Sequence, residues 1–356
     1  MGGFHAGLDR RALFERGDVY RVGLDEERAS RQPVRLAILG AGGVAQAKYL
    51  PALARLRTLW EPVEVVALST IDRRQREKLS KLFGGRVYGD SDELLRDQQP
   101  DAVLVTSSDD AHCELALAAL EAGAHVLVEK PIARSLREAA QMCRAAEAAG
   151  RVLVTTCNKR FSPPYAEARR LLDSGELARP SLFAAKFTLG YENVDLLAAG
   201  TVHVFDLARF FMGDVRSLSA VAAAASRENA IATLEFMSGA AGSVLTSAGA
   251  LSLHPWERVE IFGDGSWLVV EDQAVLTLHR AEYEPARTWA PVVPNTLLSA
   301  EEWGGYVGLL EDFLDSVRRQ SPTAETTWDG YHALELVVAT RRSLGSGGRV
   351  ELPLEP

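Results

Sequence analysis

Hydrophobic and polar positions follow one regular pattern between residues 33 and 157. Short, nearly continuous apolar runs alternate with longer stretches in which apolar residues recur at helical spacing. Continuous apolar runs are typical of strands that are buried on both faces of a parallel sheet. The predicted strands cover 34–40, 63–69, 101–107, 125–131 and 152–157, and the predicted helices cover 42–56, 73–83, 111–122 and 136–149. This alternation predicts βαβ units and a doubly wound parallel sheet.

The pattern changes after residue 157. A helix is predicted at 163–172, and it is followed by β-rich runs joined by short turns. These runs cover 182–191, 215–225, 229–236, 241–248, 258–263 and 266–272. They predict one large, mostly antiparallel sheet, and amphipathic helices at 303–319 and 330–344 close the chain. We therefore divide the chain into an extension at 1–32 that is either flexible or in contact with a partner subunit, a domain at 33–157 and an α+β domain at 158–356.

Composition narrows the classes of partner. The 356 residues carry a net charge of −9, which argues against nucleic acid and anionic membranes, because both require clustered Lys and Arg. No apolar run approaches the roughly 20 residues that span a bilayer. The charged N-terminus lacks the apolar segment of a secretory signal. The three cysteines are widely spaced, so we predict buried thiols in a cytoplasmic protein without a metal site.

A glycine-rich turn follows the first predicted strand. The sequence from Gly40 to Ala45 reads G-A-G-G-V-A and opens a predicted helix. Gly40 permits the tight turn, Gly42 lets the backbone approach a pyrophosphate, and the small Ala45 lets helix and strand pack closely. Gly-rich turns also arise for structural reasons alone, but strand and helix are both in place here. We predict that Gly40, Gly42, Gly43 and Val44 bind a dinucleotide, and that residues 33–157 form an N-terminal Rossmann domain.

The end of the second predicted strand bears on the choice of cofactor. An acid commonly stands there and binds the adenosine ribose of NAD. This chain has Thr70 at that place, followed by Asp72 and Arg73. A hydroxyl with a nearby guanidinium favours the 2′-phosphate of NADP through charge-assisted hydrogen bonds. The alternative is that Asp72 caps the next helix while Arg73 lies on the surface. The predicted cofactor is NADP or NAD, with a slight preference for NADP.

The tripeptide E-K-P at 129–131 lies at the carboxyl end of the predicted strand at 125–131, the edge where open α/β sheets bind ligands. Pro131 restricts the backbone of Lys130 to an extended conformation and so directs its ammonium group. A lysine placed there can hold a substrate oxygen and exchange its proton while a hydride moves. The alternative is a surface lysine at the end of a strand. We predict that Lys130 is catalytic.

In this order, the three motifs resemble the Gfo/Idh/MocA family, the glucose–fructose oxidoreductase and inositol dehydrogenase group, from Val34 to about Pro353. The resemblance implies that Lys130 lies near nicotinamide and substrate. The segment T-S-S-D-D-A-H at 106–112 looks like the family's stretch that lines the nicotinamide ribose, and N-K-R-F-S-P at 158–163 resembles its N-x-R-x-x-P. The further cofactor contacts implied are Ser107, Ser108, His112, Glu129, Lys130, Asn158 and Arg160.

A second family signature, D-x-x-x-H-x-x-D, appears here as A-G-T-V-H-V-F-D at 199–206. His203 and Asp206 match it, whereas Ala199 replaces the first acid. In the family that acid and the histidine act with the lysine on the substrate hydroxyl, which implies a catalytic role for His203. For Asp206, three residues further on, we predict a structural role. Alanine can neither orient His203 nor tune its pKa. The nearby side chains that can substitute for the acid are Tyr191, Glu192 and Asp195.

These features predict an NAD(P)-dependent oxidoreductase. The resemblance implies hydride transfer between nicotinamide and a sugar, cyclitol or sugar-derivative alcohol/ketone pair, by a homodimer or homotetramer. Because the acid is missing at Ala199, the alternative is a nucleotide-binding sensor or regulatory protein of the same fold without dehydrogenase activity. A third hypothesis is a reductase of non-carbohydrate carbonyls, which a pocket poor in hydrogen-bonding groups would favour.

Overall fold

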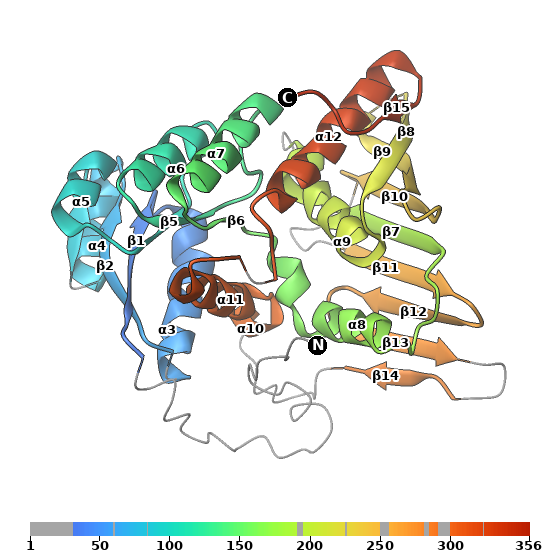
Figure 1. Ribbon diagram of the computed structural model, residues 1–356, viewed down its shortest axis with the longest axis horizontal. Helices are drawn as coiled ribbons and strands as arrows, with labels where there is room; N and C mark the ends of the chain where they lie inside the picture. The colour runs from blue at the N-terminus through green and yellow to red at the C-terminus, as the bar shows by residue number, and fades with distance from the viewer. Residues whose placement is uncertain are drawn as a thin grey trace.

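The computed structural model describes residues 31–59, 61–83, 85–190, 195–224, 226–249, 256–280, 285–290, 300–322 and 324–356. The predicted extension at 1–32 falls outside the described residues except for its last two, so its role stays a prediction. Two sheets stand side by side, and helices lie between them (Figure 1). None of the helices in the described part of the chain is long and apolar enough to cross a bilayer.

The first sheet has six strands, in the order β3-β2-β1-β4-β5-β6, and every pair is parallel. The strands are β1 (Val34–Leu39), β2 (Val63–Ser69), β3 (Arg86–Tyr88), β4 (Ala102–Val105), β5 (His125–Val128) and β6 (Leu153–Thr155). The chain order reverses between β1 and β4, and ligands of open α/β sheets bind at such a point, beyond the carboxyl ends of the strands. The predicted doubly wound sheet is confirmed.

Both faces of this sheet are buried, which explains its continuous apolar runs. On β1, Leu36 and Ile38 belong to a core shared with α3 (Leu50–Thr58) and α11 (Tyr306–Arg319). Ala37 and Leu39 point to the opposite core, which includes residues of α6 (His112–Glu121) and α7 (Leu136–Ala149). The helices α4 (Arg73–Phe83) and α5 (Ser91–Gln98) complete this unit. A helix from the C-terminal part of the chain, α11, is therefore part of the Rossmann unit.

The second sheet has nine strands, in the order β14-β13-β12-β11-β7-β10-β9-β8-β15. The strands are β7 (Leu182–Thr188), β8 (Val215–Ala223), β9 (Ser226–Phe236), β10 (Ala241–Ser247), β11 (Trp256–Gly263), β12 (Ser266–Glu271), β13 (Val275–Arg280), β14 (Arg287–Trp289) and β15 (Val350–Glu351). Only β7 and β10 pair in parallel within the described sheet, so the predicted mostly antiparallel sheet is confirmed.

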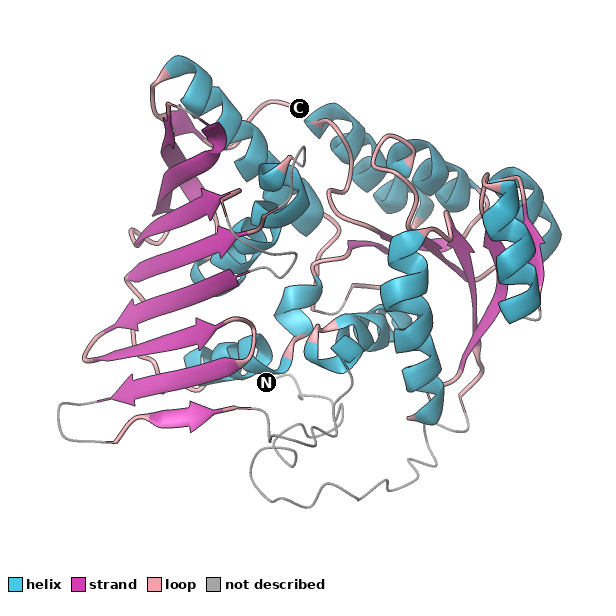
Figure 2. Ribbon diagram, turned by 180° about the vertical axis from the view of Figure 1, so that it is seen from behind, coloured by secondary structure: helices cyan, strands magenta, loops and turns pink. Residues whose placement is uncertain are grey.

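Three helices cover one face of the nine-stranded sheet: α8 (Pro163–Asp173), α9 (Val202–Met212) and α12 (Asp329–Ser346). In the described part of the chain no helix lies on the other face, here called the uncovered face (Figure 2), and it carries exposed apolar side chains. These side chains include Leu182, Val221, Ile231, Leu245, Trp256 and Trp267. The covered face turns towards the Rossmann unit, so a site at the carboxyl edge of the first sheet lies between the two sheets (Figure 1).

Candidate active site

The turn after β1 has two parts with different steric demands. Gly40 has φ +83°, and a Cβ there would lie 2.5 Å from the Cα of Ser107, so only glycine fits between β1 and the loop after β4. Among the described residues other than the chain neighbours, the nearest atom to such a Cβ at Gly42 is the Gly40 carbonyl oxygen at 3.8 Å, and at Gly43 none lies within 4 Å. This open space stands before the helical turn η1 (Ala45–Tyr49) and the exposed Val44. A pyrophosphate fits such a place, because the N-terminal end of a helical segment favours a bound anion.

At the end of β2, Asp72 caps the next helix and Arg73 lies on the surface, which is the alternative to a cofactor site. One carboxylate oxygen of Asp72 accepts hydrogen bonds from the backbone N–H groups of Arg74 at 2.8 Å and Gln75 at 3.2 Å, so Asp72 caps α4. Arg73 is exposed and donates to Glu77 at 3.2 Å. Thr70 is buried next to this cap. A cofactor contact from Thr70 or Arg73 stays a prediction.

His112 connects two loops at the carboxyl edge of the sheet. Its side chain is fully buried, with Nδ1 2.9 Å from the carbonyl oxygen of Pro131 and Nε2 3.3 Å from that of Ser107. The Ser108 carbonyl accepts the backbone N–H of Ala111, which starts the next helix. His112 thus holds the Ser107–Ser108 loop against the segment that follows Lys130. The structure gives His112 a positioning role, and direct cofactor contacts by these residues stay predictions.

Lys130 follows β5 and is fixed at its backbone. Its N–H donates to Glu129 Oε2 at 2.9 Å and to the hydroxyl of Thr156 at 3.1 Å. Glu129 is itself held by the hydroxyl of Tyr49, which donates to Oε1 at 2.6 Å. The Lys130 ammonium then reaches across to donate to the carbonyl oxygen of Ala199 at 2.6 Å. Glu129 therefore fixes the backbone of Lys130, and the Lys130 ammonium reaches the second domain.

His203 is the second residue of α9, directly after the helical turn η3 (Leu197–Thr201), as predicted from its motif. Ala199 lies one turn earlier on the same face, so the Lys130 contact with its carbonyl brings lysine and histidine to one place. Desolvation, followed by the positive charges of Lys130 and Lys159, lowers the pKa of His203 well below its usual value. The imidazole is therefore neutral at neutral pH.

The acid that Ala199 lacks is not supplied by any described contact. Asp195 is half exposed and forms an ion pair with Arg341. The described contacts do not join it to His203, so its substitution for the missing acid stays a prediction. Tyr191 and Glu192 lie outside the described residues.

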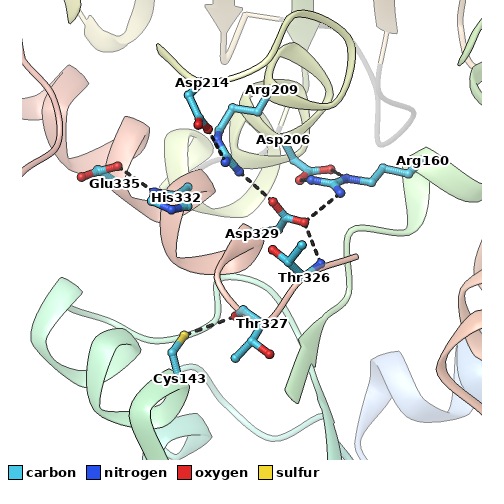
Figure 3. A network of polar contacts seen from close by, with 10 residues as sticks. All are labelled: Cys143, Arg160, Asp206, Arg209, Asp214, Thr326, Thr327, Asp329, His332 and Glu335. Atoms are coloured by element: carbon cyan, nitrogen blue, oxygen red, sulfur yellow. Dashed lines mark hydrogen bonds and ion pairs between the residues drawn. The ribbon is translucent and has the colours of Figure 1, made fainter. Parts of the chain in front are cut away.

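Arg160 lies in a buried ion-pair network (Figure 3). Its Nε donates to Asp206 at 2.8 Å and its Nη1 to Asp329 at 3.1 Å, and Arg209 donates to the other oxygen of Asp329 at 3.0 Å. Burial by itself would raise the pKa of Asp329, but Arg160, the Thr326 N–H and Arg209 lower it to about 2. The structural role expected of Asp206 is confirmed, and a cofactor contact by Arg160 stays a prediction.

Asn158 is also engaged within the protein. Its Nδ2 donates to the carbonyl oxygen of Gly304 at 2.7 Å, in the turn before α11. It opens the short helix η2 (Asn158–Phe161), which leads from the first sheet towards the second. The structure thus ties Asn158 to the segment that brings α11 back to the Rossmann unit, and its predicted cofactor contact stays untested.

Sequence reasoning missed Lys159, which lies between the two predicted residues of η2. Its side chain is 6% exposed and forms a buried ion pair with Glu257 on β11. The only signal in the sequence was a lysine inside a motif, because its acidic partner is 98 residues away. Tyr165 was missed for the same reason, and its hydroxyl donates to the second oxygen of Glu257 at 2.9 Å.

The burial of Glu325 leads us to expect a measurable dependence of the protein's stability on pH. It is fully buried, and burial raises its pKa well above the usual 4.5, aided by Asp206 and Asp329 against Arg160. An acid whose pKa is raised in the folded state stabilises the protein below its unfolded pKa and loses that contribution as the pH rises. We expect Glu325→Gln to gain stability over the parent by up to about 1.4 kcal/mol per pH unit above about pH 4.5.

Urea unfolding at several pH values between about 5 and 8 measures this difference. The exposed Glu64 offers the matched control, because Glu64→Gln should leave the pH dependence as it is in the parent. Equal slopes for the parent and Glu325→Gln would contradict a raised pKa at this position.

Comparison with known proteins covers most of the chain. Residues 34–156 match an oxidoreductase family described by its NAD-binding Rossmann fold, and residues 196–352 match the C-terminal alpha/beta domain of the same oxidoreductase family. The myo-inositol 2-dehydrogenase of Thermotoga maritima is 27% identical over 340 residues, 90% of this chain and 98% of that protein. The scyllo-inositol 2-dehydrogenase (NAD(+)) of Bacillus subtilis is 26% identical, over 90% of this chain and 97% of its own length.

A levoglucosan dehydrogenase solved in complex with NADH superposes with a TM-score of 0.82. It is 20% identical and is matched over its whole length and over 90% of this chain. At that identity the likeness shows the fold, and it extends through both sheets.

Proposed function

Since the chain belongs to the Gfo/Idh/MocA oxidoreductase family, we propose that it is an NAD-dependent dehydrogenase or reductase of a cyclitol, sugar or sugar derivative. The observation that carries this proposal is the contact of the Lys130 ammonium with the Ala199 carbonyl of η3, one turn before His203, at the carboxyl edge of the Rossmann sheet. The inositol dehydrogenases among its relatives support the substrate class. We divide the work between a nucleotide domain at 33–157 and a substrate domain at 158–356, of which α11 packs into the Rossmann unit.

The residues present fit a dinucleotide. No described side chain fills the space over Gly42 and Gly43, and this space suits a pyrophosphate. Because Gly40 has no side chain, the turn also packs closely against Ser107. When it is bound, NAD supplies the carbon that accepts or returns the hydride. The hydrogen bond of Glu129 with Tyr49 and the contact of His112 with the Pro131 carbonyl fix the loops next to the proposed cofactor site.

The side chains of this site suit an exchange of proton and hydride at a carbinol. In the oxidative direction, the Lys130 ammonium exchanges the Ala199 carbonyl for the substrate oxygen and stabilises its developing negative charge. The neutral imidazole of His203 accepts the hydroxyl proton, so the O–H bond breaks while the substrate carbon gives up a hydride and becomes a carbonyl. Reduction reverses each transfer. The low pKa of His203 keeps it ready to accept that proton.

The test is a panel of cyclitols, hexoses and sugar acids, offered to the purified chain with NAD⁺ and followed at the nicotinamide absorbance. Reduction of NAD⁺ by at least one compound is expected. The alternative, a nucleotide-binding sensor or regulatory protein of the same fold, is favoured by alanine at position 199. Tight NADH binding without turnover of any polyol would support that alternative.

We propose NAD rather than NADP as the preferred cofactor. Although the sequence by itself leans to NADP, the Asp72 carboxylate held at the start of α4 repels a 2′-phosphate, and Arg73 is already paired with Glu77. NADH is expected to bind at least about tenfold more tightly than NADPH, and Arg73→Ala should leave NADH affinity unchanged. Titration by fluorescence measures both. Tighter binding of NADPH that Arg73→Ala abolishes would restore the preference for NADP.

We propose that the uncovered face of the nine-stranded sheet binds a second copy of this chain. Val221, Ile231 and Leu245 are exposed cross-strand neighbours and form one apolar row over β8, β9 and β10. Such a flat face can pair with itself about a two-fold axis. Ile231→Lys is expected to lower the mass measured by light scattering to that of a monomer. The exposed Leu82 on α4 gives the control Leu82→Lys, and a monomeric parent would contradict the proposal.

We also propose that the enzyme works in the cytoplasm. Cys113, Cys143 and Cys157 are free thiols, and burial raises the pKa of each. Thiols of this kind are compatible with a reducing compartment.

A further inference from the structure

The backbone amide of Lys130 is held by two side chains from the ends of neighbouring strands. Its N–H donates to Glu129 Oε2 at 2.9 Å and to the hydroxyl of Thr156 at 3.1 Å. Thr156 follows β6 and is 1% exposed, so the amide is fixed inside the protein. The Lys130 side chain starts from this fixed point and spans the distance to the Ala199 carbonyl. The place that its ammonium reaches therefore depends on the backbone at position 130.

Tyr49 holds the Glu129 carboxylate in the orientation that this amide needs. The hydroxyl of Tyr49 donates to Oε1 at 2.6 Å, while Oε2 accepts the Lys130 N–H. Tyr49 and Glu129 are both buried, and a buried carboxylate requires a donor for each oxygen. Burial, followed by the negative charge of Glu129, raises the pKa of the Tyr49 phenol well above its usual value. The phenol therefore keeps its proton and remains a donor.

The place of Tyr49 in the fold joins three parts of the chain. Tyr49 is the last residue of η1, the helical turn that follows the glycine-rich turn. Its ring packs edge-on against that of Tyr306, the first residue of α11, with the ring centres 5.4 Å apart and the planes at 88°. Its hydroxyl reaches Glu129 at the end of β5. One buried phenol thus connects the turn proposed for the cofactor, the returning helix α11 and the segment of the catalytic lysine.

We propose that Tyr49 is a positioning residue of the hydride-transfer site, where its hydroxyl orients Glu129 and so fixes the backbone from which Lys130 reaches the substrate oxygen. This inference rests on the proposed dehydrogenase function. Glu129 and the lysine side chain separate Tyr49 from the reacting ammonium, so Tyr49 acts through them. A displacement of about 1 Å at a catalytic group can cost about a hundredfold in rate, which makes this hydrogen bond important to turnover.

Hydrogen exchange of the Lys130 amide tests the contact without any turnover. The full chain is labelled with ¹⁵N-lysine, and the Lys130 signal is assigned by its loss in Lys130→Met. Tyr49→Phe keeps the ring and removes only the hydroxyl, and the Lys130 amide should then exchange at least about tenfold faster than in the parent. The amide of Lys81 on α4 should exchange as before. Tyr88→Phe is the matched control, because the buried Tyr88 hydroxyl contacts Asp97 instead, and it should leave exchange at Lys130 unchanged.

Kinetics in two backgrounds separate positioning from a general loss of structure. Tyr49→Phe should lower kcat by about ten- to a hundredfold, while KM and the NADH affinity change by less than about threefold. In Glu129→Ala the same substitution should lower kcat no further, because the residue through which Tyr49 acts is already gone. A structural role for the hydroxyl would lower kcat by the same factor in both backgrounds.

Unchanged exchange at Lys130 in Tyr49→Phe would overturn the proposal, and so would an equal loss of kcat in the two backgrounds. Failure of the proposed function has a different signature. In that case the parent reduces no NAD⁺ with any polyol, while the exchange of the Lys130 amide still responds to Tyr49→Phe.

Discussion

Lys130→Met is expected to lower kcat by about three orders of magnitude while the affinity for NADH changes by less than about threefold. The ammonium of Lys130 contacts the Ala199 carbonyl, one turn before His203, so its loss removes the group that stabilises negative charge on the substrate oxygen. Its backbone contacts to Glu129 and Thr156 survive the substitution, and the loop therefore keeps its shape. Steady-state kinetics and a fluorescence titration measure the two quantities on the same preparation.

Lys78→Met is the matched control, because Lys78 is an exposed lysine on α4. It should leave both kcat and the NADH affinity unchanged. Retention of more than about a tenth of kcat in Lys130→Met would contradict a catalytic role for this lysine. A parallel loss of NADH affinity and kcat would instead make Lys130 a binding residue.

Gly40→Ala is expected to destabilise the protein by about 2–5 kcal/mol and to abolish NADH binding. The new Cβ would lie 2.5 Å from Ser107 Cα, and a φ of +83° disfavours any side chain. The loop after β4 must move, which displaces the Ser107 carbonyl that contacts His112. Urea unfolding and NADH titration measure the two effects.

Gly43→Ala is expected to lower the affinity for NADH without a large loss of stability. Because no atom lies within 4 Å of the added Cβ, stability should change by less than about 1 kcal/mol. The methyl group enters the space assigned to the pyrophosphate, so NADH affinity should fall by at least about tenfold. Unchanged NADH affinity in Gly43→Ala would contradict the assignment of this space.

The Rossmann unit could be predicted from sequence because its signals are local. Apolar runs identify strands that are buried on both faces, and the turn at Gly40 follows one of them directly. The short strand β3 and the short helix α5 were missed, since three and eight residues carry little periodicity. The position of α11 in the core of the Rossmann unit was also missed, because no local pattern tells which of two sheets an amphipathic helix covers.

In the candidate site, too, local motifs could be predicted from the sequence and long-range contacts could not. Motifs located Lys130 and His203, but the partners that set their charge come from distant strands. The pairing of Lys159 with Glu257 joins residues 98 positions apart, and no spacing rule encodes it. Conversely, Arg160 was assigned to the cofactor from its motif, although the structure surrounds it with Asp206 and Asp329. A motif gives the residue type at a position, and only the packed structure gives the partner.

Transfer of deuterium from the substrate carbon to the cofactor distinguishes a dehydrogenase from a protein that only binds the nucleotide. A cyclitol or sugar from the panel, deuterated at the reacting carbon, is incubated with NAD⁺ and the parent protein, and the reduced cofactor is analysed by mass spectrometry. We expect one deuterium in the NADH that the parent forms, and no NADH above background with Lys130→Met. Reduced cofactor without label, or no reduction by any polyol of the panel, would contradict it.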